Sequence, residues 1–279
     1  MARRKPSRRT RSATIPVRRM DLEFHEDVPR FYFDGNPFLT AMLSAMSVSF
    51  PAGERFFIRS VLHYLPSITN PALREAVQGF VGQEANHTKE HIAFNTFLDR
   101  AGFPASELER ITTARIDALT ERLSPEQNLA RTVAIEHFTT ILSGAFLEHP
   151  DVFERMHPDA ATLWAWHAIE EIEHRSVAYD VYQEVCGDEA LLRRAMVAIT
   201  VIFVVANGVR MGQLLASTGD LANVRAARQA AKVLFGERGV FRGLGKRYLS
   251  FYRKGFHPSQ HAFELEVARA KARYLGARA

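Results

Sequence analysis

A Glu-x-x-His pattern that occurs twice constrains the fold of this chain more than any other feature. Glu84 and His87 form the first pair, and Glu171 and His174 form the second. Side chains three positions apart leave the same face of a helix, so each pair would place a carboxylate beside an imidazole. One such pair alone is usually part of a solvated helix surface, but two in matching halves of a chain indicate a shared site.

A lone glutamate precedes each pair at a similar interval. Glu54 lies 30 residues before Glu84, and Glu136 lies 35 residues before Glu171. Two helices that each give one glutamate, with two that each give Glu-x-x-His, form the ligand set of ferritin-like di-iron and di-manganese bundles. No segment shows the period-two alternation of a strand. The sequence therefore predicts an all-α fold, a ferritin-like four-helix bundle with additional C-terminal helices.

A third histidine, His167, falls four residues before Glu171 and within about 60° of both Glu171 and His174 on a helix. Iron and manganese accept carboxylate and imidazole ligands. Four glutamates balance the charge of two divalent ions, whereas facing carboxylates in an apolar surrounding without metal would be costly. We expect two iron ions, with manganese or a mixed pair as alternatives. The predicted metal ligands are Glu54, Glu84, His87, Glu136, His167, Glu171 and His174.

Two neighbours of these residues leave alternatives open. Glu170 competes with Glu171, which is preferred because it repeats the Glu-x-x-His spacing. His91, four residues after His87, is a further ligand, a residue that supports a ligand, or a core histidine. Three other histidines are expected to be ordinary: His63, His137 and His149.

Composition places the chain among ordinary globular proteins, because 47% of its 279 residues are hydrophobic and 24% are charged. Cys186 is the only cysteine, which excludes an internal disulfide and a thiolate metal cluster and fits a cytoplasmic protein. Residues 1–20 carry eight lysines and arginines and no acid, so the net charge of +5 leaves about −3 for the rest. This basic arm lacks the apolar core of a secretory signal.

The arm, residues 1–20, is expected to be disordered and solvated, with contact to anionic lipid or nucleic acid as the alternative. Residues 21–279 are expected to form one helical domain, with the bundle at about 38–186 and a C-terminal helical extension at about 189–279. We expect no specific nucleic acid partner, and a homodimer is possible.

Cap and breaker residues predict the helix boundaries. A helix starts at Asn36-Pro37 and is broken or kinked at Pro51. Further helices are expected from Pro71 to about Arg100, over 105–122, from the capping box at Ser124–Gln127 to about His149, and from Asp159 to Val185.

Residues 195–206 are almost wholly apolar. The uninterrupted run of about 12 residues is too short to span a bilayer, which needs about 20. We expect a buried fifth helix packed against the bundle, with an interfacial helix and peripheral membrane contact as the competitor.

Over most of its length, from about Arg19 to Tyr274, the chain resembles the bacterial family described as predicted metal-dependent hydrolases. The segments that carry the resemblance are the Glu54 segment, EANHTKEH (84–91), EHFT (136–139), HAIEEIEH (167–174) and GFHPSQH (255–261). The ligand pattern, with its His-x-x-x-Glu-x-x-His stretch, also resembles that of the p-aminobenzoate N-oxygenase type of di-iron protein. That second resemblance covers the bundle only and implies no arylamine substrate.

The expected activity is that of a di-iron oxidase or oxygenase, which would use O2 and an electron donor to oxidise a small apolar substrate. The substrate pocket is expected beside the metals, lined by Phe56 and Phe57 and closed by the apolar 195–216 segment. One alternative is a metal-dependent hydrolase that uses two metals to activate water. The other is a metal-storing or membrane-associated scaffold without enzymatic activity.

Overall fold

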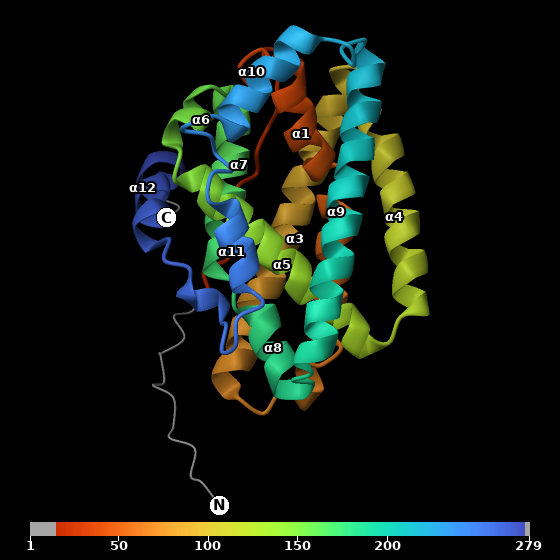
Figure 1. Ribbon diagram of the computed structural model, residues 1–279, viewed down its shortest axis with the longest axis vertical. Helices are drawn as coiled ribbons and strands as arrows, with labels where there is room; N and C mark the ends of the chain where they lie inside the picture. The colour runs from red at the N-terminus through yellow and green to blue at the C-terminus, as the bar shows by residue number, and fades with distance from the viewer. Residues whose placement is uncertain (1–14, 277–279) are drawn as a thin grey trace, which may run out of the picture.

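The computed structural model describes residues 15–276 and is built from helices. Among those residues the extended pairing is limited to an isolated bridge between Phe33 and Met156. The predicted all-α class is therefore confirmed, and the arrangement is consistent with a ferritin-like bundle. The long helices run roughly along the long axis of the molecule (Figure 1).

Cap residues fix where the bundle helices begin. Pro51 does not kink a single helix but separates two, because it stands in the first turn of the second one. The predicted capping box is present, with the Ser124 hydroxyl accepting from the Gln127 amide while Gln127 Oε1 accepts from the amide of Ser124. The bundle helices are α2 (Phe50–Leu62), α3 (Pro71–Arg100), α5 (Pro125–Leu147), α7 (Pro158–Glu173) and α8 (Val177–Val185).

The expected fourth helix, from Asp159 to Val185, is interrupted in the structure. Helix α7 ends at Glu173, and α8 begins at Val177. His174 caps α7 with φ −98° and ψ 3°, and Arg175 Nη1 donates to the carbonyl of Ile172 at 2.6 Å. The side-chain bond stabilises the break, which no proline or glycine announces in the sequence.

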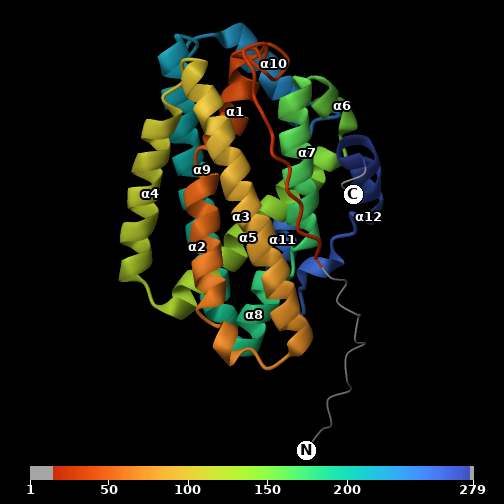
Figure 2. The same cartoon turned by 180° about the vertical axis from the view of Figure 1, so that it is seen from behind.

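Other helices surround the bundle, as the view from behind also shows (Figure 2). Helix α4 packs on α2 and α3, α9 packs on α1 and α5, and the C-terminal elements cover α1, α5 and α7. These elements are α1 (Pro37–Ser47), η1 (Leu65–Ser67), α4 (Ala105–Arg122), α6 (Pro150–Glu154), α9 (Glu189–Thr218), α10 (Val224–Phe235), α11 (Leu244–Ser250), η2 (Pro258–Gln260), α12 (Glu264–Ala270) and η3 (Lys271–Leu275).

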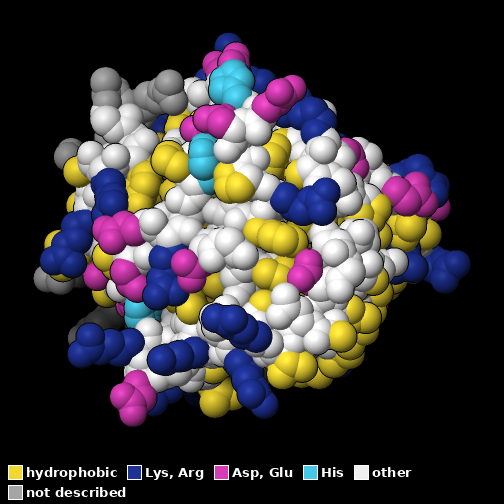
Figure 3. Space-filling view, turned by 90° about the horizontal axis from the view of Figure 1, so that it is seen from above, with side chains coloured by type: hydrophobic (Ala, Val, Ile, Leu, Met, Phe, Trp, Pro, Cys, Tyr) yellow, Lys and Arg dark blue, Asp and Glu magenta, His cyan; other side chains and the backbone are white. Residues whose placement is uncertain are grey.

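Helix α9 is less buried than the sequence predicts. By length and composition it is the one helix of the described residues that could cross a membrane, and 17% of its most apolar window is buried. It packs on α1 and α5 through one face, but Val201, Val204 and Val205 on the other face are 60%, 63% and 58% exposed. The expectation of a buried fifth helix is therefore wrong for the outer face. Apolar side chains also gather along one edge of the upper surface (Figure 3).

Residues 15–22, which we call the N-terminal strap, lie against the bundle. Ile15 and Val17 pack so closely on α3 that a Cβ at Gly79 or Gly82 would lie 2.6 Å from their side chains. Arg18 and Met20 are 6% and 2% exposed. The expectation of a disordered arm therefore does not hold for residues 15–20, because apolar contacts and a buried ion pair fix them. Residues 1–14 lie outside the described part of the chain.

Candidate metal centre

The seven predicted ligands converge in the middle of the bundle. The two ligands on α3, Glu84 and His87, lie between two apolar clusters along that helix. One cluster contains Phe80 and the other contains Phe94. Helix α2 contributes one of the seven, α3 two and α5 one, and the C-terminal half of α7 with its cap residue contributes three. Each is at most 4% exposed, and together we call them the carboxylate–histidine cluster: Glu54, Glu84, His87, Glu136, His167, Glu171 and His174.

The cluster divides into two groups, each of which has the ligand spacing of one metal ion. Within each group the possible ligand atoms all lie within 4.8 Å of one another. Glu136 joins the second group, because its Oε2 lies 3.3 Å from His174 Nε2. The first group is Glu54, His87 and His167, and the second is Glu84, Glu171 and His174.

Glu171 lies between the two groups. Its Oε1 is 3.3 Å from His167 Nε2, 3.6 Å from His174 Nε2 and 3.7 Å from His87 Nδ1. One carboxylate at the junction of two metal groups has the position of a bridging ligand. The preference for Glu171 over Glu170 thus agrees with where the structure places the two side chains.

The polar atoms of the cluster fit a cation better than they fit one another. Among the described residues, neither oxygen of Glu54, Glu84 or Glu136 has a hydrogen-bond partner of good geometry. Buried polar atoms without partners are rare and costly in native proteins. Two divalent ions would satisfy these oxygens and balance four carboxylates, so the residues present fit a dinuclear site. Metal binding itself stays a prediction.

When no metal is bound, protonation of cluster residues reduces the negative charge that metal ions would balance. Burial raises the pKa of Glu136 to about 7, and it raises those of Glu54 and Glu84 well above their ordinary value. Burial also acts to raise the pKa of Glu171, but the imidazoles beside it outweigh burial and hold that pKa well below its usual range. Burial acts to lower the pKa of His174, yet Glu136 and Glu171 raise it well above the usual range.

We therefore expect metal-free protein to lose stability as the pH rises from about 5 to 8. Glu136 has a folded pKa above its unfolded value, so its contribution is present at low pH and is lost as the pH rises through about 7. A shift from 4.5 to about 7 corresponds to about 3 kcal/mol for this group alone. Urea unfolding with a chelator, at pH 5.5 and 8, measures the loss. Metal-loaded protein is the control and should not lose stability over this pH range. An equal dependence of the unfolding free energy on pH with and without metal would contradict the expectation.

A hydrogen-bond chain sets which nitrogen of His167 faces the cluster. Ser47 Oγ donates to Asn95 Oδ1 at 2.7 Å, so it accepts from His91 Nδ1 at 2.9 Å. Burial lowers the pKa of His91 well below its usual value, and the neutral ring therefore accepts at Nε2 from His167 Nδ1 at 3.0 Å. His167 is left with a free lone pair on Nε2, which faces Glu171. His91 is thus a supporting residue, and it is not among the atoms of either metal group.

Gln83 fixes which nitrogen of His174 faces the cluster. Its Nε2 donates to the carbonyl of Pro16 at 2.8 Å and to Glu173 Oε2 at 2.8 Å. Its Oε1 therefore accepts from His174 Nδ1 at 2.9 Å. His174 Nε2 then faces Glu84, whose Oε1 lies 3.2 Å away. This leaves the nitrogen that faces the cluster free to bind a metal ion.

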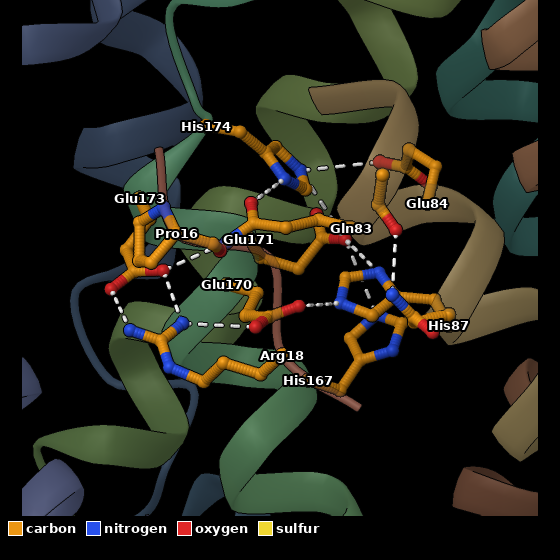
Figure 4. A network of polar contacts seen from close by, with 12 residues as sticks. Pro16, Arg18, Gln83, Glu84, His87, His167, Glu170, Glu171, Glu173 and His174 are labelled. Carbon is orange, nitrogen blue, oxygen red and sulfur yellow. Dashed lines mark hydrogen bonds and ion pairs between the residues drawn. The ribbon is translucent and has the colours of Figure 1, made fainter. Parts of the chain in front are cut away.

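Glu170 and Arg18 orient His87, the remaining histidine of the cluster (Figure 4). Glu170 Oε2 accepts from His87 Nε2 at 3.1 Å, while Glu170 Oε1 accepts from Arg18 Nη1 at 2.9 Å. Burial lowers the pKa of His87 well below its usual range, so the neutral ring has its lone pair on Nδ1, the atom toward Glu171. His87 and His167 therefore turn a lone pair toward the cluster, and His174 turns its Nε2 toward it.

The supporting residues were harder to find from the sequence than the cluster. His91 was detectable because it follows His87 by one helical turn. Arg18 carried no such signal, because it stands in a basic stretch and its partners Glu170 and Glu173 are 152 and 155 residues away.

A cavity of about 110 Å³ lies between α2, α4, α5 and α9, and its lining includes Gly53 and Ile135, the sequence neighbours of Glu54 and Glu136. As expected from the sequence, Phe56 and Phe57 line it and the apolar residues of α9 close it. A second cavity of about 30 Å³ shares Phe50 and Thr139 with the first and is lined by His167. The Phe50 ring stacks on His167 at 4.6 Å, so the apolar walls reach the cluster itself.

Comparison with known proteins identifies the family. The family model described as "Predicted metal-dependent hydrolase" matches residues 16–262, a stretch that contains residues 16–22 of the strap and every residue of the cluster. Comparisons with curated proteins and with solved structures find no match. Kinship with the ferritin-like superfamily and with the N-oxygenases stays a prediction. The chain belongs to the family of predicted metal-dependent hydrolases.

Proposed function

We propose that this protein is an enzyme with a dinuclear metal centre in the core of its helical bundle. The observation that supports the proposal most strongly is the cluster itself, in which four carboxylates and three imidazoles are buried and form two groups of ligand spacing. A scaffold would gain nothing from burying seven such groups, since unpaired buried charge costs stability. Iron is the metal we propose, with manganese or a mixed pair as alternatives, because carboxylate and imidazole suit both.

Hydrolysis is the first candidate reaction, because it is the activity in the description of the family. A bound metal pair supplies a Lewis acid and an activated water. The chain's own residues hold that pair in place, orient the three imidazoles through Gln83, His91 and Glu170, and exclude bulk water from the site.

O2-dependent oxidation is the second candidate, and the surroundings of the cluster favour it. The cavity between α2, α4, α5 and α9 is lined mainly by apolar and aromatic residues, and one of them, Phe50, stacks on His167. An apolar lining suits a substrate without polar leaving groups, and the carboxylate-rich set suits redox-active iron. This reaction would also require O2 and an electron donor.

Metal loading and O2 consumption separate these possibilities. Protein freed of metal is loaded with Fe²⁺ or Mn²⁺ without O2, and its metal content is measured. O2 uptake and a change in the optical spectrum after O2 is added would support oxidation. Ester or amide cleavage without O2 would support hydrolysis. Failure to bind two ions per chain would overturn the proposed dinuclear centre.

Three further expectations remain proposals. A cytoplasmic location is one, and a homodimer is another. Peripheral membrane contact is the third, and the exposed valines of α9 support it. Flotation decides the third, because binding driven by α9 would occur with neutral liposomes, whereas binding driven by the basic arm would require anionic liposomes and be released by salt.

A further inference from the structure

Arg131 on α5 is a buried cation without an acidic partner. Its side chain is 8% exposed, and among residues 15–276 it forms no ion pair. Nη1 donates to Asn128 Oδ1 at 3.2 Å, the guanidinium carbon lies 4.9 Å above the Phe56 ring, and Nε has no partner. Most of its five N–H donors therefore lack an acceptor within the described chain.

A second arginine lines the same cavity from α9. Arg210 Nε donates to Thr112 Oγ1 at 3.1 Å, and no described carboxylate pairs with it. Burial lowers the pKa of each arginine to about 10, so both remain charged at neutral pH. Within the described part of the chain, no aspartate or glutamate belongs to the cavity lining. Two cations thus face an apolar cavity that supplies no anion.

Uncompensated charge in an apolar surrounding is costly, and the usual partner of a buried guanidinium is a carboxylate or phosphate. The remaining lining is apolar and aromatic, including Phe57, Ile199 and Phe203. The missing partner therefore belongs to a molecule with two parts, an anionic head for the arginine and an apolar body for the rest.

We propose that this cavity binds an amphipathic carboxylate, with Arg131 as the anchor of its head group. The proposal rests on the proposed enzymatic function in one respect, because it takes this molecule to be the substrate of the metal centre. Arg131, Ile135 and Thr139 form one stripe along α5 that spans about 12 Å. Glu136 lies beside this stripe, and Thr139 also lines the small cavity at His167. A chain anchored at Arg131 would pass the cluster with its apolar part.

Octanoate and 1-octanol are matched probes for this site, since they share the apolar body and differ in head-group charge. Calorimetric titration of the full chain should give octanoate a dissociation constant at least about tenfold lower than that of 1-octanol. Equal constants would overturn the inference. Metal content is measured on the same sample, so that loss of the metal centre and loss of the anion site are read separately.

Arg131→Met should remove the preference for octanoate, and Arg210→Met should reduce it. Arg193→Met is the control, because Arg193 lies on α9 in an exposed ion pair with Glu189 and outside the cavity. An unchanged preference in Arg131→Met would overturn the anchor.

The melting temperature of ligand-free protein separates anchoring from a structural role. If the partner of Arg131 is an anionic ligand, Arg131→Met should melt at the same temperature as the parent protein or higher, because the substitution removes an unpaired buried charge. A large fall in melting temperature, with octanoate still stabilising the variant as it stabilises the parent, would assign Arg131 to packing on Phe56 and overturn the proposal.

Discussion

Replacing Glu171 by alanine should reduce the metal content to below one ion per chain. Glu171 Oε1 lies within 3.7 Å of a nitrogen of each of the three cluster histidines, at the junction of the two metal groups. Removing it takes a ligand from both groups at once, whereas loss of Glu84 takes one from the second group only. The readout is the metal content after loading, measured by elemental mass spectrometry. Circular dichroism checks the fold.

Glu170→Gln is the matched control for that experiment. Glu170 is the neighbour of Glu171, but it accepts a hydrogen bond from His87 instead of joining a metal group. A glutamine oxygen can still accept that bond, so this variant should retain both ions. Retention of two ions by Glu171→Ala, or their loss only in Glu170→Gln, would show that the wrong glutamate has been assigned.

Arg18→Met should lower the free energy of unfolding by about 3 kcal/mol, the scale measured when one partner of a buried ion pair is removed. Arg18 binds Glu170 at 2.9 Å and Glu173 at 2.7 Å. Even with Arg18 present, burial raises the pKa of Glu170 to about 7. Without Arg18, folding would bury the Glu170 carboxylate unpaired or require its protonation, so the loss should be larger at pH 8 than at pH 6. Urea unfolding at both pH values measures it.

Two variants sharpen that test. Arg19→Met removes the adjacent but exposed arginine and should change the stability little. Adding Glu170→Gln to Arg18→Met removes the orphaned charge and should recover part of the loss. If Arg18→Met were as stable as the parent at both pH values and kept its metal content, the buried ion pairs of Arg18 would not stabilise the fold.

Local signals in the sequence predicted the elements that local chemistry controls. The Ser124 capping box predicted a helix start and the proline at position 51 predicted a helix break, and both are present, because caps and breakers act within one turn. The cluster was predictable for a related reason, since helical spacing alone puts Glu171 and His174 on one face. The break after Glu173 was not predictable, because a side-chain bond from Arg175 to Ile172 stabilises it rather than a helix-breaking residue.

Features that depend on distant parts of the chain were out of reach. A helix apolar on nearly all sides, as α9 is, does not reveal which face a neighbour will cover, so the exposure of Val201 and Val204 could not be foreseen. The docking of Arg18 depends on residues more than 150 positions away. The support of His174 by Gln83 likewise joins residues 91 positions apart.

The strap also fixes an order of events during synthesis. Arg18 leaves the ribosome before its partners Glu170 and Glu173, which follow 152 and 155 residues later. The strap therefore docks only after the last cluster helix has been made. Until then Gln83 lacks its contact with Pro16, and the surface of α3 at Gly79 and Gly82 is uncovered. Docking of the strap is therefore a late step, and it completes the support that Gln83 gives to His174.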